Sequence, residues 1–175
     1  MARGRVVGAL VIAAALTTGA CGGGTKAVVR LDGSPRHADV EGVVVTAGAG
    51  GITLDHKRAF AVSKQLVSFS TYNHKLVPLA SMIGAYVQAG LKDKTIVWIS
   101  KIGPVSTDAS GHRTAQYQGT LVKVDGADFV FKDGTVLRLS AGLRPPADPL
   151  GPLYAVIDAD KHVIQGATFS ARSKN

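Results

Sequence analysis

Cys21 is the residue of this chain whose surroundings point most directly to a chemical reaction. It is the only cysteine, and it follows Arg3, Arg5, an apolar stretch over 6–16 and small residues over 17–20. The apolar stretch has 11 residues, whereas a membrane-spanning helix needs roughly 17 to 25. Basic, apolar and small residues in this order are typical of a cleaved export signal. The reaction that the pattern predicts is modification of the Cys21 thiol.

The segment Gly19-Ala20-Cys21 resembles the end of the lipobox in bacterial lipoproteins. In that family the signal peptide is cleaved before the cysteine, whose sulfur receives a diacylglyceryl group, with acyl chains such as palmitate. The resemblance implies removal of 1–20 and lipidation of Cys21. The chain departs from the family at Thr18, where leucine is favoured. The alternative is an ordinary secretory signal with a cysteine near its cleavage site by chance.

The cysteine count supports lipidation independently. An exported protein meets an oxidising compartment, where acylation would consume a lone thiol. A disulfide within the chain and a Cys-based metal site are both excluded, because there is no second cysteine. Residues 22–24 are all glycine, which is typical of a flexible tether. We therefore expect a cell-membrane protein, lipid-anchored on the extracytoplasmic side.

Removal of 1–20 leaves 155 residues with 18 Lys plus Arg against 12 Asp plus Glu, a formal charge of +6. A positive balance favours contact with anionic lipid headgroups or envelope polyanions. The expected partners are the membrane, through the lipid anchor, and an envelope protein, glycan or lipid. Nucleic acid is not expected in this compartment.

Acidic groups that could work as a catalytic pair are scarce. Glu41 is the only glutamate, and most aspartates stand in expected turns, where turn chemistry explains them. Asp158 and Asp160 have the spacing of a calcium loop, but Val163 replaces the required glycine and the closing glutamate is missing. We assign them to a hairpin turn.

Nucleophile and metal patterns are equally weak. Ser106, Asp108 and His112 are the ingredients of a hydrolase triad, but they share one loop and lack a nucleophile elbow. The five histidines are dispersed through expected turns, with no pair at helix-face spacing. The sequence therefore predicts no catalytic residue, no metal site and no cofactor, and the chain is not expected to be an enzyme.

Aromatic and cationic side chains on strand faces are candidates for binding, because such groups commonly recognise sugars or protein partners. The four candidates are Tyr86, Trp98, Tyr117 and Arg138. Core packing explains the aromatic residues equally well, and Trp98 stands in an apolar run over 96–99 that favours burial.

These residues must be positioned by β-structure, because short runs rich in Val, Ile, Leu and Phe alternate with Gly and Asp. Strands are expected over 41–46, 51–55, 60–63, 119–124, 128–132 and 136–140. Asp125-Gly126 and Asp133-Gly134 predict tight turns. We expect a loop with at most one helical turn over 79–87.

The pattern repeats when the chain is shifted by 77 residues, which places Gly42 on Gly119 and Ile52 on Phe129. Later the shift becomes 68, so the first copy has nine extra residues, expected around 70–75. Each copy has the strand count of a small barrel. Two unrelated Val-rich meanders could also align this well, so a true duplication stays one of two interpretations.

The second copy resembles the OB-like domains of bacterial extracytoplasmic proteins, and the resemblance carries no functional residues. The expected fold is all-β, with two tandem OB-like five-stranded barrels or one barrel built from two repeated meanders. The expected division of the chain is a signal over 1–20, a lipidated tether over 21–40, a first repeat over 41–104, a linker loop over 105–117, a second repeat over 118–170 and a tail over 171–175.

Three functions are compatible with this organisation. The first is a membrane-anchored binding or scaffold module of the cell envelope. The second is a carrier of lipid or glycolipid with an open barrel cavity, and the third is an envelope hydrolase.

Overall fold

The computed structural model describes residues 33–169, and the chain within them is all-β, as the sequence predicts. The expected export signal over 1–20, Cys21 and the tail over 171–175 lie outside the described residues. The strands are β1 (Val40–Gly48), β2 (Gly51–Leu54), β3 (Arg58–Ser70), β4 (Ala85–Lys92), β5 (Thr95–Thr107), β6 (Arg113–Asp125), β7 (Asp128–Phe131), β8 (Val136–Arg138), β9 (Gly151–Asp158) and β10 (Val163–Phe169). Two 3-10 turns, η1 (Asp55–Lys57) and η2 (Leu79–Met82), are the helical elements of the described part.

Strands β1 to β5 form a closed ring. β1 pairs with β2 and β4, β2 pairs with β3, and β4 pairs with β5, all antiparallel. β3 and β5 then run parallel and close the ring. This first ring is a small five-stranded barrel, as expected from the strand count.

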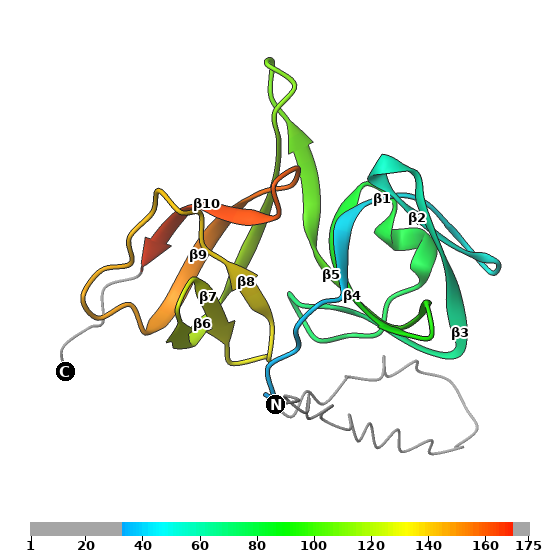
Figure 1. Ribbon diagram of the computed structural model, residues 1–175, viewed down its shortest axis with the longest axis horizontal. Coiled ribbons are helices and arrows are strands. Elements are labelled where there is room, and N and C mark those ends of the chain that lie inside the picture. The colour runs from blue at the N-terminus through cyan, green and yellow to red at the C-terminus, as the bar shows by residue number, and fades with distance from the viewer. Residues whose placement is uncertain (1–32, 170–175) are drawn as a thin grey trace, which may run out of the picture.

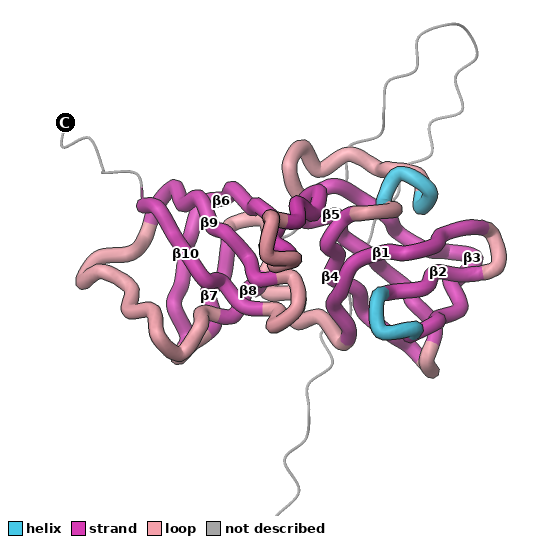
Figure 2. The backbone as a smooth tube through the Cα atoms, turned by 90° about the horizontal axis from the view of Figure 1, so that it is seen from above, coloured by secondary structure: helices cyan, strands magenta, loops and turns pink. Residues whose placement is uncertain are grey.

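Strands β6 to β10 repeat this order in a second ring beside the first (Figure 1). β6 pairs with β7 and β9, β7 pairs with β8, and β9 pairs with β10, all antiparallel. β8 has only three residues and forms no ladder with β10. A single parallel bridge between Leu139 and Ile164 closes the second ring instead. Figure 2 shows the two rings side by side from above.

The pairing details follow the shift seen in the sequence. The β1–β2 and β6–β7 ladders have a bulge at equivalent positions. The parallel pair Val62 and Ile96 of the first ring corresponds to the bridge between Leu139 and Ile164 in the second. The same plan therefore occurs twice in space as well as in sequence.

One detail of the alignment differs from expectation. The constant shift of 68 places Ile157 on Ala89. In the structure, however, Ala89 pairs with Val40 of β1, and Tyr117, the equivalent of Val40 in β6, pairs with Ala155. Ala155 is therefore the counterpart of Ala89. The reason is the hairpin turn, because residues 159–162 replace the shorter turn over 93–94.

Each ring encloses its own apolar core. The first core consists of Val44, Ile52, Leu54, Met82, Val87, Ala89, Ile96 and Ile99. The second consists mainly of Ala115, Tyr117, Leu121, Phe129, Phe131, Leu137, Leu139, Leu153, Ala155, Ile157, Ala159 and Ile164. Val43, Tyr86 and Ile102 of the first ring pack into the second core. The chain therefore has two filled barrels that share a small apolar contact.

The segment over 105–117 differs from the expected linker loop, because β5 and β6 continue through most of it and form a projecting hairpin (Figure 1). Gly103 and Pro104 look like strand breakers in the sequence. Gly103 is instead needed for a close approach, since a Cβ there would lie 2.5 Å from the carbonyl oxygen of Gln116. The segment over 79–87 contains the one helical turn that was expected, η2, but its last residues already belong to β4.

Candidate functional site

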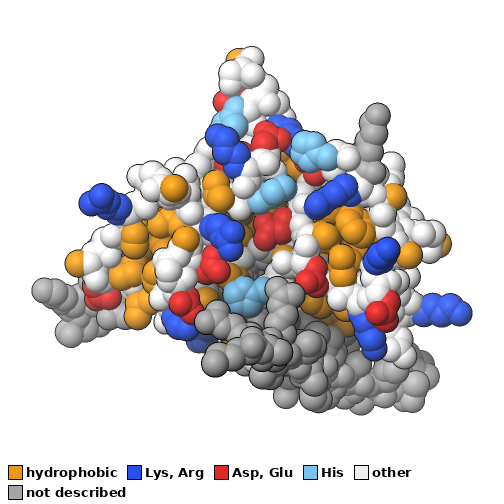
Figure 3. Space-filling view, viewed as in Figure 1, with side chains coloured by type: hydrophobic (Ala, Val, Ile, Leu, Met, Phe, Trp, Pro, Cys, Tyr) orange, Lys and Arg blue, Asp and Glu red, His pale blue; other side chains and the backbone are white. Residues whose placement is uncertain are grey.

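Charged and polar side chains gather between the two rings (Figure 3), and we call this region the seam. Its members are Glu41, Asp55, His56, Arg58, Tyr86, Gln88, Arg113, Asp158, Asp160 and His162. Turns supply several of them: η1 contributes Asp55 and His56, and the β9–β10 turn contributes Asp160 and His162. The seam therefore joins residues that are far apart in the sequence.

Arg113 links the two rings by an ion-pair bridge. Its Nη2 lies 2.6 Å from Oδ2 of Asp55, and its Nε donates to Oδ1 of Asp160 at 2.9 Å. The nearly buried carboxylate of Asp55 also accepts a hydrogen bond from the backbone N–H of Val43 at 3.0 Å. Gly42 leaves room for this carboxylate, since a Cβ there would lie 2.5 Å from Oδ1 of Asp55.

The bridge shifts the ionisation of its members. The hydrogen bond between Arg113 and Asp160 raises the pKa of Arg113 and lowers the pKa of Asp160. Burial raises the pKa of Asp158, but hydrogen bonds from Lys161, His112 and the Asp160 backbone outweigh it, so the pKa is lowered. A lowered carboxyl pKa stabilises the fold above the unfolded value of about 3.9, and this stability is lost as pH falls through the folded pKa. The seam is therefore expected to weaken in acid.

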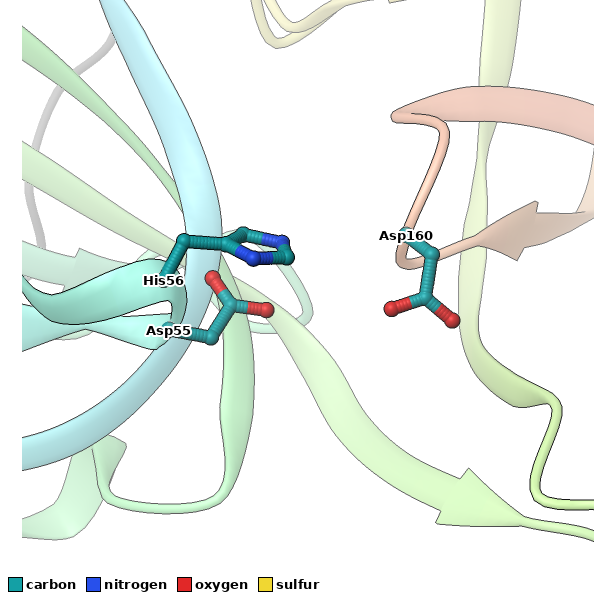
Figure 4. A group of neighbouring side chains, drawn as sticks. All are labelled: Asp55, His56 and Asp160. Carbon is teal, nitrogen blue, oxygen red and sulfur yellow. The ribbon is translucent and has the colours of Figure 1, made fainter.

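Asp55, His56 and Asp160 point toward one another across the seam (Figure 4). Their potential ligand atoms all lie within 4.8 Å of one another. However, the Arg113 guanidinium already pairs with both carboxylates, so a metal ion would have to displace this cation. We interpret the group as part of the ion-pair bridge.

A hydrogen-bonded chain runs from His162 to Glu41 through Tyr86. The Tyr86 hydroxyl donates to Oε2 of Glu41 and lies 3.2 Å from Nδ1 of His162. Since the one proton of the hydroxyl is donated to Glu41, a hydrogen bond between Tyr86 and His162 requires a proton on Nδ1 of His162. Gln88 fixes the other end, donating from Nε2 to Oε1 of Glu41 at 3.0 Å and to the carbonyl oxygen of Val136 at 2.8 Å.

Burial, reinforced by Glu41, raises the pKa of Tyr86. Burial, reinforced by Asp133, likewise raises the pKa of Tyr117. In an alkaline titration, we expect phenolate absorbance from no more than two of the four tyrosines before the protein unfolds. These two neutral phenols stabilise the fold below the unfolded pKa of about 10, and the stability is lost as pH rises toward their folded pKa. Ionisation of all four with unchanged circular dichroism would contradict the burial of Tyr86 and Tyr117.

A groove of about 460 Å³ opens at the seam. The first ring and the segment before it line one side with His37, Ala38, Asp39, Val40, Glu41 and Arg58, and the second ring lines the other with Asp128, Val136, Arg138, Lys161, His162 and Val163. The volume lies in the range of small-molecule sites. A second, more open concavity of about 580 Å³ lies over β1, β2 and β3, and its lining has no charged side chain.

The four candidate binding residues separate into two groups. Arg138 lines the groove, and Tyr86 lies fully buried beneath it, in contact with Glu41 and His162. Trp98 and Tyr117 lie elsewhere. Trp98 is half-buried on β5 against Gly90, where a Cβ would lie 2.0 Å from the indole Nε1. Tyr117 is buried, donates to Oδ1 of Asp133 at 3.1 Å, and packs edge-on against Phe131.

Asp108 and His112 are engaged in structural contacts. Asp108 accepts hydrogen bonds at the β5–β6 turn from the backbone N–H groups of Ser110 and His112 at 2.8 and 3.0 Å. The Nε2 of His112 lies 3.4 Å from Oδ2 of Asp158, so the imidazole faces the second barrel. In the described part of the chain, no hydrogen bond joins Ser106 to either residue.

Sequence reasoning missed Asp55, Gln88 and Arg113 as members of the seam. Their partners lie far along the chain, and their types are common in turns and strands. The one feature of the sequence that could have indicated the seam was Glu41, because it is the only glutamate of the chain and lies in a strand.

No protein-family model matches this chain, and searches of the curated proteins and of the solved structures found no match. Among residues 33–169 there is no helix with the length and apolar character needed to cross a membrane.

Proposed function

We propose that this protein is a membrane-anchored binding module of the cell envelope and that its ligand site is the groove at the seam. The proposal rests on the position of the concave space in the molecule, which lies between the rings and not inside them. Both ring interiors are filled by buried side chains, whereas the groove between the rings is lined by titratable groups from both. Concave sites with a few convergent polar groups are the usual places for small ligands.

The anchor in this proposal is a lipid on Cys21. Twelve residues lead from Cys21 to Gly33, where the described chain begins, so the connection spans at most about 40 Å. A lipid with two acyl chains binds membranes stably, because each buried methylene contributes about 0.8 kcal/mol. The groove would then be held near the membrane surface.

Replacing Cys21 by alanine is expected to leave an unprocessed and unacylated precursor, because the sulfur that receives the lipid is gone. Intact mass spectrometry and membrane fractionation measure this. A Cys21→Ala protein that keeps both the mass of the acylated form and its membrane attachment would exclude the lipid anchor.

Filling the groove tests the binding function. Ala38→Trp places a large ring among the lining residues, and Ala109→Trp makes the same change on the exposed β5–β6 turn. Native mass spectrometry of the full-length protein, extracted gently from its membrane, should detect a bound species in the wild type and in Ala109→Trp. The bound species should be absent from Ala38→Trp. A wild-type protein without any bound species, or one that Ala38→Trp retains, would overturn the proposal.

A carrier of lipid or glycolipid is a second candidate, but it needs a contiguous apolar cavity. Side chains such as Leu54, Ile99 and Phe131 are fully buried inside the rings and occupy that space. Acyl chains found inside either ring would favour the carrier. Turnover of an envelope substrate, lost on changing a single Asp or His, would instead favour the third candidate, a hydrolase.

A further inference from the structure

We propose that the groove takes a phosphate ester and that Arg58 and Arg138, from opposite walls, hold its phosphate group. This inference rests on the proposed binding function and names the class of ligand. Arg58 begins β3 in the first ring, and Arg138 ends β8 in the second. Both line the groove.

Each carboxylate that lines the groove already accepts at least one hydrogen bond from a protein donor. Both carboxylate oxygens of Glu41 accept hydrogen bonds, from Tyr86 and Gln88. Oδ2 of Asp39 accepts from the backbone N–H of Leu91 at 2.7 Å. Oδ1 of Asp128 accepts from Nε of Arg138 at 3.2 Å. A ligand that donates hydrogen bonds would therefore have to compete with these contacts.

The donors of the groove are only partly used. Each guanidinium has five N–H donors. Arg58 donates from Nη2 to the carbonyl oxygen of Glu41 at 3.1 Å, and Arg138 donates from Nε to Asp128. Their remaining N–H groups have no partner among the described residues, and the Arg138 side chain is 67% exposed. The unused hydrogen-bonding capacity therefore suits a ligand rich in acceptors.

The guanidinium of Arg58 also lies 5.9 Å from the centre of the Phe60 ring, a second contact beside its hydrogen bond to Glu41. A guanidinium can bind two oxygens of one anion in parallel. A single guanidinium can satisfy the two oxygens of a carboxylate. A phosphate monoester has three terminal oxygens and up to two charges, so donors on opposite walls match it better. Lys161 also lines the groove, but its Nζ lies 3.3 Å from Oδ2 of Asp158 and is paired with that carboxylate.

The groove lining is close to neutral, because Asp39, Glu41 and Asp128 balance Arg58, Arg138 and Lys161. Binding of a phosphate ester would therefore depend on individual hydrogen bonds from the two guanidinium groups more than on the net electrostatic potential of the groove. A variant that keeps the charge but loses the parallel donors should then also bind poorly, and Arg58→Lys is such a variant.

Isothermal titration calorimetry of the full-length protein in non-ionic detergent tests this, with glycerol 1-phosphate as the free ester and glycerol as the probe without phosphate. Glycerol 1-phosphate should bind and glycerol should not. Arg58→Gln, Arg138→Gln and Arg58→Lys should each weaken binding by about tenfold or more, the loss expected for a charge-assisted hydrogen bond. Arg144→Gln, which removes an exposed arginine outside the groove lining, should change it by less than about twofold.

Dihexanoyl phosphatidic acid, below its micelle concentration, distinguishes a lipid source from a soluble one. Binding of this lipid alone identifies a phospholipid headgroup, and equal binding of both esters identifies a soluble phosphate ester. If neither ester binds, or if the Arg58 and Arg138 variants bind like the wild type, the ligand class is wrong. The binding function would still stand if native mass spectrometry shows a species that Ala38→Trp excludes.

Discussion

Replacing Arg113 by methionine is expected to lower the free energy of unfolding by about 3 kcal/mol, because it leaves a nearly buried carboxylate without its counter-charge. Asp55 would keep its backbone hydrogen bond but lose the guanidinium 2.6 Å away, and Asp160 would face it across the seam. Urea-induced unfolding measures the change. Because Asp160 is 42% exposed, most of the loss should come from Asp55.

Two further variants isolate the cause. Adding Asp55→Asn to Arg113→Met removes the buried charge and should recover part of the stability. Lys123→Met breaks an ion pair whose side chains are 62% and 69% exposed, and should cost less than about 1 kcal/mol. Equal losses in Lys123→Met and Arg113→Met would contradict the role of Arg113 as the link between the rings.

Leu54→Ala and Phe131→Ala should each destabilise the protein by about 3–5 kcal/mol, because each opens a cavity in a filled core. Both side chains are fully buried, and they occupy equivalent positions under the 77-residue shift. Val45 and Val122 form an equivalent pair that is 54% and 45% exposed. Their alanine variants are the controls, and each should change stability by less than about 0.5 kcal/mol.

The two core variants also report whether the rings unfold together. Tyr86 and two other residues of the first ring pack into the second core, and Arg113 joins the rings. We therefore expect one cooperative transition in each variant, seen at the same urea concentration by fluorescence and by circular dichroism. Two separate transitions, each moved by only one variant, would mean that the rings are independent.

The repeating strands could be predicted because the signals that define them are local. Asp125-Gly126 and Asp133-Gly134 predicted turns, and the structure has turns there with positive φ at Gly126 and Gly134. The continuous hairpin at 105–117 could not be predicted, because Gly103 and Pro104 have the composition of a break. The close approach that makes Gly103 necessary exists only in three dimensions.

The seam could not be predicted because its contacts are long-range. Arg113 lies 58 residues from Asp55 and 47 from Asp160 in the sequence. No periodic pattern connects such positions, and each residue alone has the type expected of a turn or a strand end. Arg138 could be identified as a candidate because cationic side chains on strand faces commonly take part in recognition, but its place beside the groove depends on how the rings meet.

The proposed binding mode places the ligand in the groove between the rings and not elsewhere on the barrels. Its most direct test is an amide chemical-shift map of the full-length protein, titrated with the species that native extraction releases. We predict shifts concentrated at residues 37–41, 136–138 and 161–163, which line the groove. Shifts confined to the uncharged concavity over 46–53 and 59–61, with none at the groove, would rule out binding in the groove.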